Sequence, residues 1–160
     1  EFMVMVCSSL EKDIIKQSPL PKKRHHEGSL AELVGRDYSF LRINKEDFSR
    51  YRFVDFPGIV YASLLKEFIN GGINELELLI DGELAKGRVN RSKEIISSLC
   101  KIDLGRIHLI KGPKLDQKYP IVNIADEIAN YLFKMYSTNE GNLPLLLTGH
   151  EKKLLNLDSL

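Results

Sequence analysis

The chain has 160 residues, of which 43% are hydrophobic and 28% charged, the composition of a globular protein with enough apolar material for one core. Its 23 lysine and arginine residues against 22 acidic residues give a formal net charge of +1, which excludes a globally basic nucleic-acid binder and leaves only a local basic surface. No apolar run approaches the roughly 20 residues of a membrane-spanning helix, so we expect no membrane partner.

Cysteine usage predicts a reducing, cytoplasmic environment. Cys7 and Cys100 lie in apolar stretches and lack the paired spacing of a disulfide framework or a zinc site. The sequence opens on Glu1 rather than on methionine, which is typical of a fragment or of a residue left by cloning.

The first part of the chain predicts two antiparallel strands. Residues 2–7 form a short apolar run typical of a buried strand, and residues 38–43 alternate apolar and polar side chains. Two prolines, a basic loop at 22–26 and one or two helical turns at 29–34 separate them. Because no full helix intervenes, we expect the two strands to run in opposite directions.

From Asp55 onward, helices alternate with strands. Asp55 and Pro57 suit the start of a helix, Gly71 and Gly72 suit its end, and Ser92 suits the cap of the next helix. The expected elements are a helix from about 55 to 70, a strand at 73–80, a helix at 92–100, a strand at 107–110, a helix from 120 to about 136, and a short C-terminal helix from about 151.

This alternation predicts parallel strands joined by helical crossovers, in addition to the antiparallel pair. We therefore expect a single-domain α/β protein with one mixed β-sheet and helices on both faces. The domain is expected to cover residues 1–136, with residues 137–160 forming a loop and a short helix that pack on it or extend from it.

Asp81 is the first candidate for a functional site. It ends an apolar strand and precedes Gly82, where the chain can turn tightly. In open α/β sheets, ligands bind beyond the carboxyl ends of parallel strands. Asp81 is therefore either a metal-ligating carboxylate or a turn-forming aspartate whose side chain binds nearby backbone.

Asp126 is the second candidate, on the expected helix at 120–136. At about 100° per residue, Asp126 falls on the border between the apolar and polar faces, while Glu127 falls on the polar face and is expected to be solvated. Asp126 is either a half-exposed carboxylate without a role or a second ligand that meets Asp81 at the sheet edge. Two such carboxylates could hold a divalent cation.

The segment before this helix is basic. Lys111, Lys114 and Lys118 surround Asp116, which is either a third acidic ligand or a loop residue. The lysines form either a local positive edge that binds nucleic-acid phosphates or a solvated loop. The same two interpretations apply to the basic run at 22–26.

Two segments carry a family resemblance: Leu-Leu-Ile-Asp-Gly at 78–82 and Pro-Ile-Val-Asn-Ile-Ala-Asp-Glu-Ile-Ala at 120–129. Together they resemble the ribonuclease H-like fold. More closely, residues 2–136 resemble a family of uncharacterised prokaryotic proteins with that fold, proposed to be metal-dependent nucleases. Members carry an Ala-Asp pair on the final helix, which residues 125–126 would match, and an acid ending the fourth strand, which Asp81 would match.

The resemblance implies hydrolysis of nucleic acid with two metal ions, in which carboxylates hold Mg²⁺ or Mn²⁺. Our first hypothesis is such a nuclease, with Asp81 and Asp126 as metal ligands and Asp116 as a candidate for a further catalytic acid. Family members also carry Asp-Glu-Ser-Gly on their first strand, and this chain lacks it. Its strand at 2–7 contains no acid and looks like the second strand of the family. Either a first strand precedes Glu1, or the protein lacks that acid and is inactive.

The alternative is a non-catalytic α/β binding or interaction module with the same fold. It predicts an exposed apolar patch or a homo-oligomer built by Leu145–Leu147 or by the C-terminal helix. A small-molecule site at the strand ends is a third interpretation, which an apolar pocket would favour.

Overall fold

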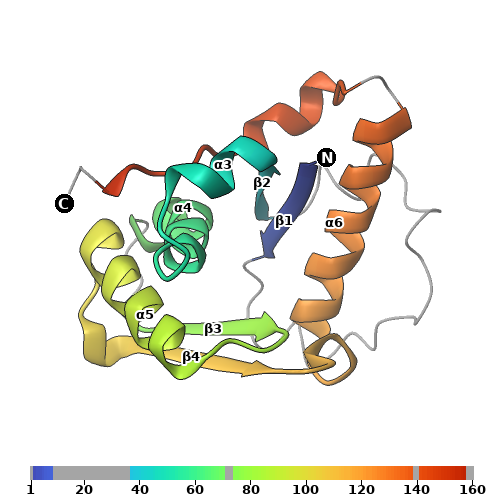
Figure 1. Ribbon diagram of the computed structural model, residues 1–160. Helices are drawn as coiled ribbons and strands as arrows, with labels where there is room; N and C mark the ends of the chain where they lie inside the picture. Colours follow the sequence, from blue (N-terminus) through green and yellow to red (C-terminus); the bar gives the residue numbers. More distant parts are fainter. Residues whose placement is uncertain (1, 9–36, 71–73, 139–140, 158–160) are drawn as a thin grey trace.

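The computed structural model describes residues 2–8, 37–70, 74–138 and 141–157 (Figure 1). The basic run at 22–26, the helical turns predicted at 29–34 and the glycines expected to end a helix at 71–72 lie outside these residues. The described elements form an α/β fold of small sheets and packed helices. No described helix has both the length and the apolar character needed to cross a bilayer.

The first sheet confirms the predicted antiparallel pair. β1 (Phe2–Ser8) runs alongside β2 (Tyr38–Asn44), with Phe2 opposite Asn44 and Ser8 opposite Tyr38. Helices cover both faces of β2, as expected. Tyr38 and Phe40 pack against α6 (Pro120–Thr138), and the alternate residues Leu41 and Ile43 pack against α4 (Phe56–Asn70).

The second sheet confirms the predicted parallel pair. β3 (Leu76–Asp81) and β4 (Ile107–Gly112) are joined by α5 (Lys86–Cys100), which packs on α4 (Figure 1). One continuous core joins these elements, and its buried members include Ile59, Leu65, Leu76, Ile95, Ile96, Leu99 and Ile107.

The expectation of one mixed sheet is not met. The described strands form two separate two-stranded sheets, β1–β2 and β3–β4. The alternation of strands and helices along a sequence indicates the direction in which consecutive strands run, but not that two strand pairs share an edge. Here α6 contacts β1 of the first sheet and β3 of the second, and also the connection between β4 and α6. A helix therefore links the two sheets.

Two predicted helices have different bounds. α5 begins at Lys86, with Ala85 as its N-cap, and Ser92 is a fully buried residue inside the helix rather than its cap. The C-terminal helix expected from about Glu151 is absent from the described residues. A 3-10 helix, η3 (Leu145–His150), precedes that point, and Lys152 N then donates a 2.8 Å hydrogen bond to the Phe40 carbonyl of β2.

One short helix was not predicted. α3 (Lys45–Arg50) begins with a capping box, in which the Asn44 side chain accepts from Asp47 N and the Asp47 side chain accepts from Asn44 N. Asn and Asp three residues apart are the sequence signal that indicates this start.

Gly58 sets the closest approach of α4 and α5. A Cβ atom at this position would lie 2.9 Å from Ser92 Cα and 3.0 Å from Ile95 Cβ. Real Cβ atoms essentially never come this close to backbone, so the two helices approach each other at this distance only because residue 58 has no side chain.

The substitution Gly58→Ala is expected to lower the free energy of unfolding by about 1–3 kcal/mol, because the added methyl group meets the backbone of α5. This cost exceeds the roughly 1 kcal/mol that alanine gains over glycine in a helix. Urea unfolding measures it. Gly87→Ala is the matched control, since nothing lies within 4 Å of a Cβ in that position, and it should leave the protein as stable or slightly more so. Equal stability of both variants would contradict the close approach.

Candidate functional site

The carboxyl ends of β3 and β4 lie side by side. The register pairs Asp81 with Gly112, and Gly82 N donates a 2.8 Å hydrogen bond to the Gly112 carbonyl. Gly82 has a φ of 126°, a conformation that favours glycine. Both strands therefore end at one edge, which is the kind of edge at which α/β proteins bind ligands.

Asp81 connects the end of β3 to the chain that follows β4. Its side chain is exposed, and its Oδ1 accepts a 2.9 Å hydrogen bond from Leu115 N. Leu115 is buried and begins the 3-10 helix η2 (Leu115–Gln117), which follows Lys114 in the left-handed conformation. Asp81 thus binds backbone, as the turn-forming interpretation proposes, but that backbone belongs to the connection between β4 and α6.

Asp126 lies in the second turn of α6 and is exposed, whereas Glu127 is half-buried. The prediction that Glu127 is the solvated residue of the two is therefore wrong. The buried stripe of α6 runs through Ile124, Ile128 and Leu132. Because Asp126 is two residues from both Ile124 and Ile128, it points about 160° away from them, on the outer side of the helix.

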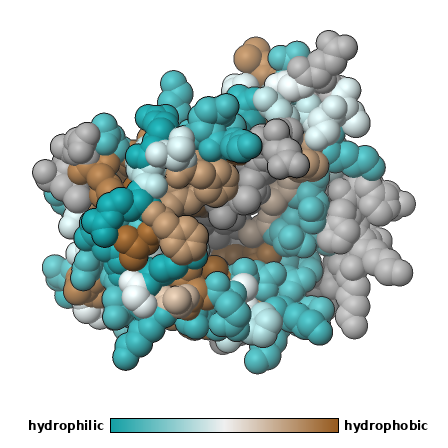
Figure 2. Space-filling model, viewed as in Figure 1, coloured by the Kyte–Doolittle hydropathy of each residue, from teal (hydrophilic) through white to brown (hydrophobic). Residues whose placement is uncertain are grey.

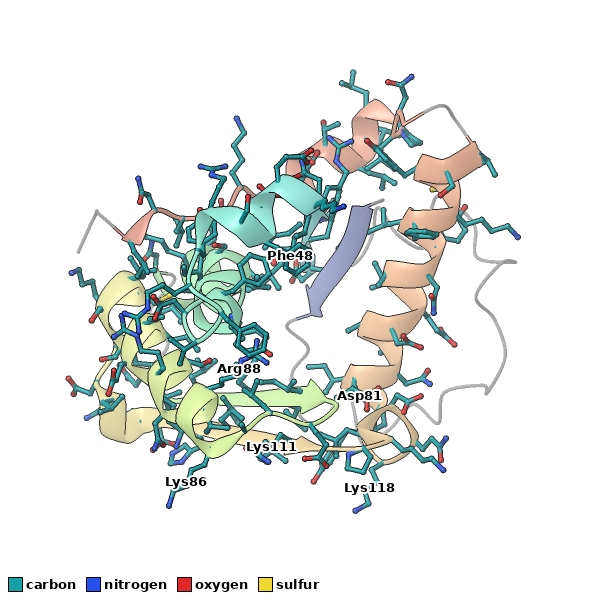
Figure 3. The ribbon with its side chains drawn as sticks, viewed as in Figure 1. Phe48, Asp81, Lys86, Arg88, Lys111 and Lys118 are labelled. Atoms are coloured by element: carbon teal, nitrogen blue, oxygen red, sulfur yellow. The ribbon has the colours of Figure 1, made fainter. Side chains whose placement is uncertain are left out.

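The predicted acids are only partly brought together. Asp81 lies at the end of β3 beside the first part of α6, and Asp116 is half-buried in η2, next to the residue that Asp81 binds (Figure 3). Within the described ranges, no three or more His, Cys, Asp or Glu residues form a group that could hold a metal ion. The carboxylates of Asp81 and Asp126 are oxygen donors of the kind that Mg²⁺ and Mn²⁺ prefer, and one or two carboxylates together with water and a substrate phosphate can hold such an ion.

Exposed lysines surround the same edge. Lys111, Lys114 and Lys118 are all exposed, and Lys111 Nζ lies 3.6 Å from Glu83 Oε2. In Figure 3, Lys118 projects from the lower edge of the molecule, and Lys86 of α5 projects on the same side. Lys86 was not among the predicted site residues. It is exposed in the first turn of α5, which begins six residues earlier than its sequence suggests.

Cys100 and Ser63 are two potential nucleophiles whose surroundings give them a role in the fold rather than in catalysis. Cys100 is buried, and burial raises the pKa of its thiol to about 11, which suppresses the reactive thiolate at neutral pH. The Ser63 hydroxyl donates to the Ile59 carbonyl and accepts from Leu155 N, so it helps to fix the C-terminal segment. Neither group points to covalent catalysis.

Comparisons with known proteins give no further indication: neither a scan against models of protein families nor a search of curated proteins finds a match. The functional argument rests on the strand-end geometry and on the residues at that edge.

Removing the Asp81 carboxylate tests its role in the connection. Asp81→Ala is expected to lower the free energy of unfolding by about 1 kcal/mol, because Leu115 N loses its acceptor. Asp81→Asn keeps an acceptor oxygen and should cost less. Asp103→Ala, an exposed change before the opposite end of β4, serves as the control in urea unfolding. If Asp81→Ala were no more damaging than the control, the hydrogen bond would contribute nothing to stability.

Proposed function

We propose that this chain is a ribonuclease H-like protein that binds nucleic acid at the edge formed by the ends of β3 and β4 and hydrolyses it with a divalent cation. One observation supports this above all: the exposed Asp81 carboxylate is fixed by Leu115 N at the carboxyl end of a parallel strand pair, where an exposed, lysine-rich connection begins. A fixed carboxylate can bind a cation without first losing side-chain freedom.

Each candidate residue has a separate role in this proposal. Asp81 is the first ligand of a Mg²⁺ or Mn²⁺ ion, and Asp126 is the second, from the adjacent helix. Asp116 supplies a further acid, and Lys111, Lys114 and Lys118 bind phosphates on either side of the scissile bond. The ion, when bound, would polarise a phosphate oxygen. The protein residues hold the substrate backbone against this edge.

Thermal unfolding with and without Mn²⁺ tests the ligands. A ligand at 100 times its dissociation constant stabilises a protein by about 2.7 kcal/mol, which should raise the Tm of the wild type by several degrees. Asp81→Asn and Asp126→Asn should abolish the shift, since each removes one charged ligand while keeping side-chain shape. Asp103→Asn is the control and should keep the shift. Equal shifts in all four proteins would eliminate the proposed metal site, and loss of the shift in Asp81→Asn alone would remove Asp126 from it.

The exposed start of η3 supports the alternative, a non-catalytic interaction module. Leu145 and Leu146 are 85% and 65% exposed, whereas Leu147 is fully buried in the core beneath α6. Two adjacent, exposed leucines are apolar surface that self-association would cover.

The mass of the protein in solution tests this alternative. If the leucines form an interface, the wild type should elute from gel filtration as a dimer, and the double variant Leu145→Ser/Leu146→Ser should elute as a monomer that is folded by circular dichroism. Leu147→Ser should instead lower the Tm, because it removes a buried side chain. A wild type that is monomeric at all accessible concentrations would argue against an interface between copies.

A further inference from the structure

Aromatic and arginine side chains follow one another through the end of α3 and the connection from α3 to α4. Phe48, Arg50, Arg52 and Phe53 are all exposed, with Phe48 at 47% and Phe53 at 76%. A ring that serves only to pack the interior would be buried, and Phe53 is three-quarters accessible. This short segment therefore presents flat apolar rings and positive charges together.

Arg88 of α5 completes this surface from the opposite side. Its guanidinium carbon lies 3.9 Å from the centre of the Phe53 ring, and its Nε is buried with no hydrogen-bond partner among the described residues. Figure 3 shows Phe48 and Arg88 on the α3 and α5 sides of the same part of the molecule. In Figure 2, apolar surface gathers in this region beside a hollow. We call Phe48, Arg52, Phe53 and Arg88 the aromatic–arginine surface.

A buried carboxylate holds this surface in place. Asp55 is only 3% exposed, its Oδ1 accepts a 2.7 Å hydrogen bond from Arg91 Nε, and its Oδ2 lies 3.8 Å from Arg52 Nε. This links the segment before α4 to α5, two residues from Phe53. Phe48 is fixed in turn by the ring of Phe56, at 4.8 Å between centroids. The rings are therefore positioned before any partner arrives, which lowers the entropy cost of binding.

The chemistry of the surface selects its partner. Guanidinium groups bind phosphates, and exposed phenylalanine rings stack on bases, which present flat faces of similar size. The phenylalanine rings and the arginines lie within six consecutive residues, 48–53. One flexible polymer that carries charges and flat rings in close succession can therefore contact both kinds of side chain at once. A duplex keeps its base faces stacked inside and offers only phosphates and base edges, so the rings would have no partner there.

We propose that the aromatic–arginine surface binds single-stranded nucleic acid. Phe53 and Phe48 stack on bases, Arg52 binds a phosphate between them, and Arg88 supports the Phe53 ring and adds positive charge. This goes beyond the hydrolysis proposed above, because it concerns a separate surface and needs no cation.

Fluorescence anisotropy with a labelled oligothymidylate, in EDTA, tests the proposal independently of the metal site. The wild type should bind the single strand more tightly than a duplex of equal length. Phe53→Ala should weaken binding by about 10-fold, within the 1–3 kcal/mol of one base stacked on an aromatic ring. Phe53→Trp should preserve or strengthen it. Arg52→Gln should weaken binding and reduce the salt dependence by about one phosphate contact.

Phe133→Ala is the matched control, because Phe133 on α6 is also exposed, at 45%, and lies outside the surface. It should bind like the wild type. Circular dichroism verifies that each variant is folded. Equal affinity for duplex and single strand, equal loss in Phe53→Ala and Phe133→Ala, or binding only to anionic lipid vesicles would each overturn the proposal. A failed Mn²⁺ shift with intact oligothymidylate binding would refute the metal site and leave this surface standing.

Discussion

The fold depends on the burial of α4 on two sides. Its residues Ile59 and Leu65 belong to the core shared with α5, β3 and β4, while Val60 and Leu64 belong to the core shared with β2. A two-stranded sheet is only marginally stable by itself, because it buries little apolar surface. Packing against α4 gives each pair the apolar partner that it lacks, so one apolar helix stabilises two small sheets at once.

Local patterns in the sequence were enough to predict most elements and the directions of the paired strands. These local predictions failed at positions where contacts with residues far away in the chain determine the structure. Ser92 has the chemistry of a helix cap, yet it is buried inside α5, where its Cα lies opposite Gly58 of α4. Glu151 would suit the start of a helix, but its carboxylate instead forms an ion pair with Arg42, which draws the segment along β2. Likewise, no local pattern indicates that the two strand pairs keep separate edges.

At the candidate site, too, some features could be predicted from the local sequence and others could not. Asp81 could be found from its place at the end of a strand, whereas its partner is a backbone N–H, which carries no side-chain signal. A small error in helix phase reversed the expected exposures of Asp126 and Glu127. The alternation of Phe and Arg at residues 48–53 is visible in the sequence, but the approach of Arg88 to Phe53 depends on how α5 packs on the chain that leads into α4.

The C-terminal segment has a consequence for biogenesis. Arg42 and Glu151, which join β2 to this segment, are 109 residues apart in the chain, and His150 stacks on Tyr38 across a similar separation. Such pairs form only after a long loop has closed. During translation, β2 therefore lacks its final neighbours until residue 151 has left the ribosome exit tunnel. Until then, the side of β2 that meets this segment stays uncovered on the nascent chain.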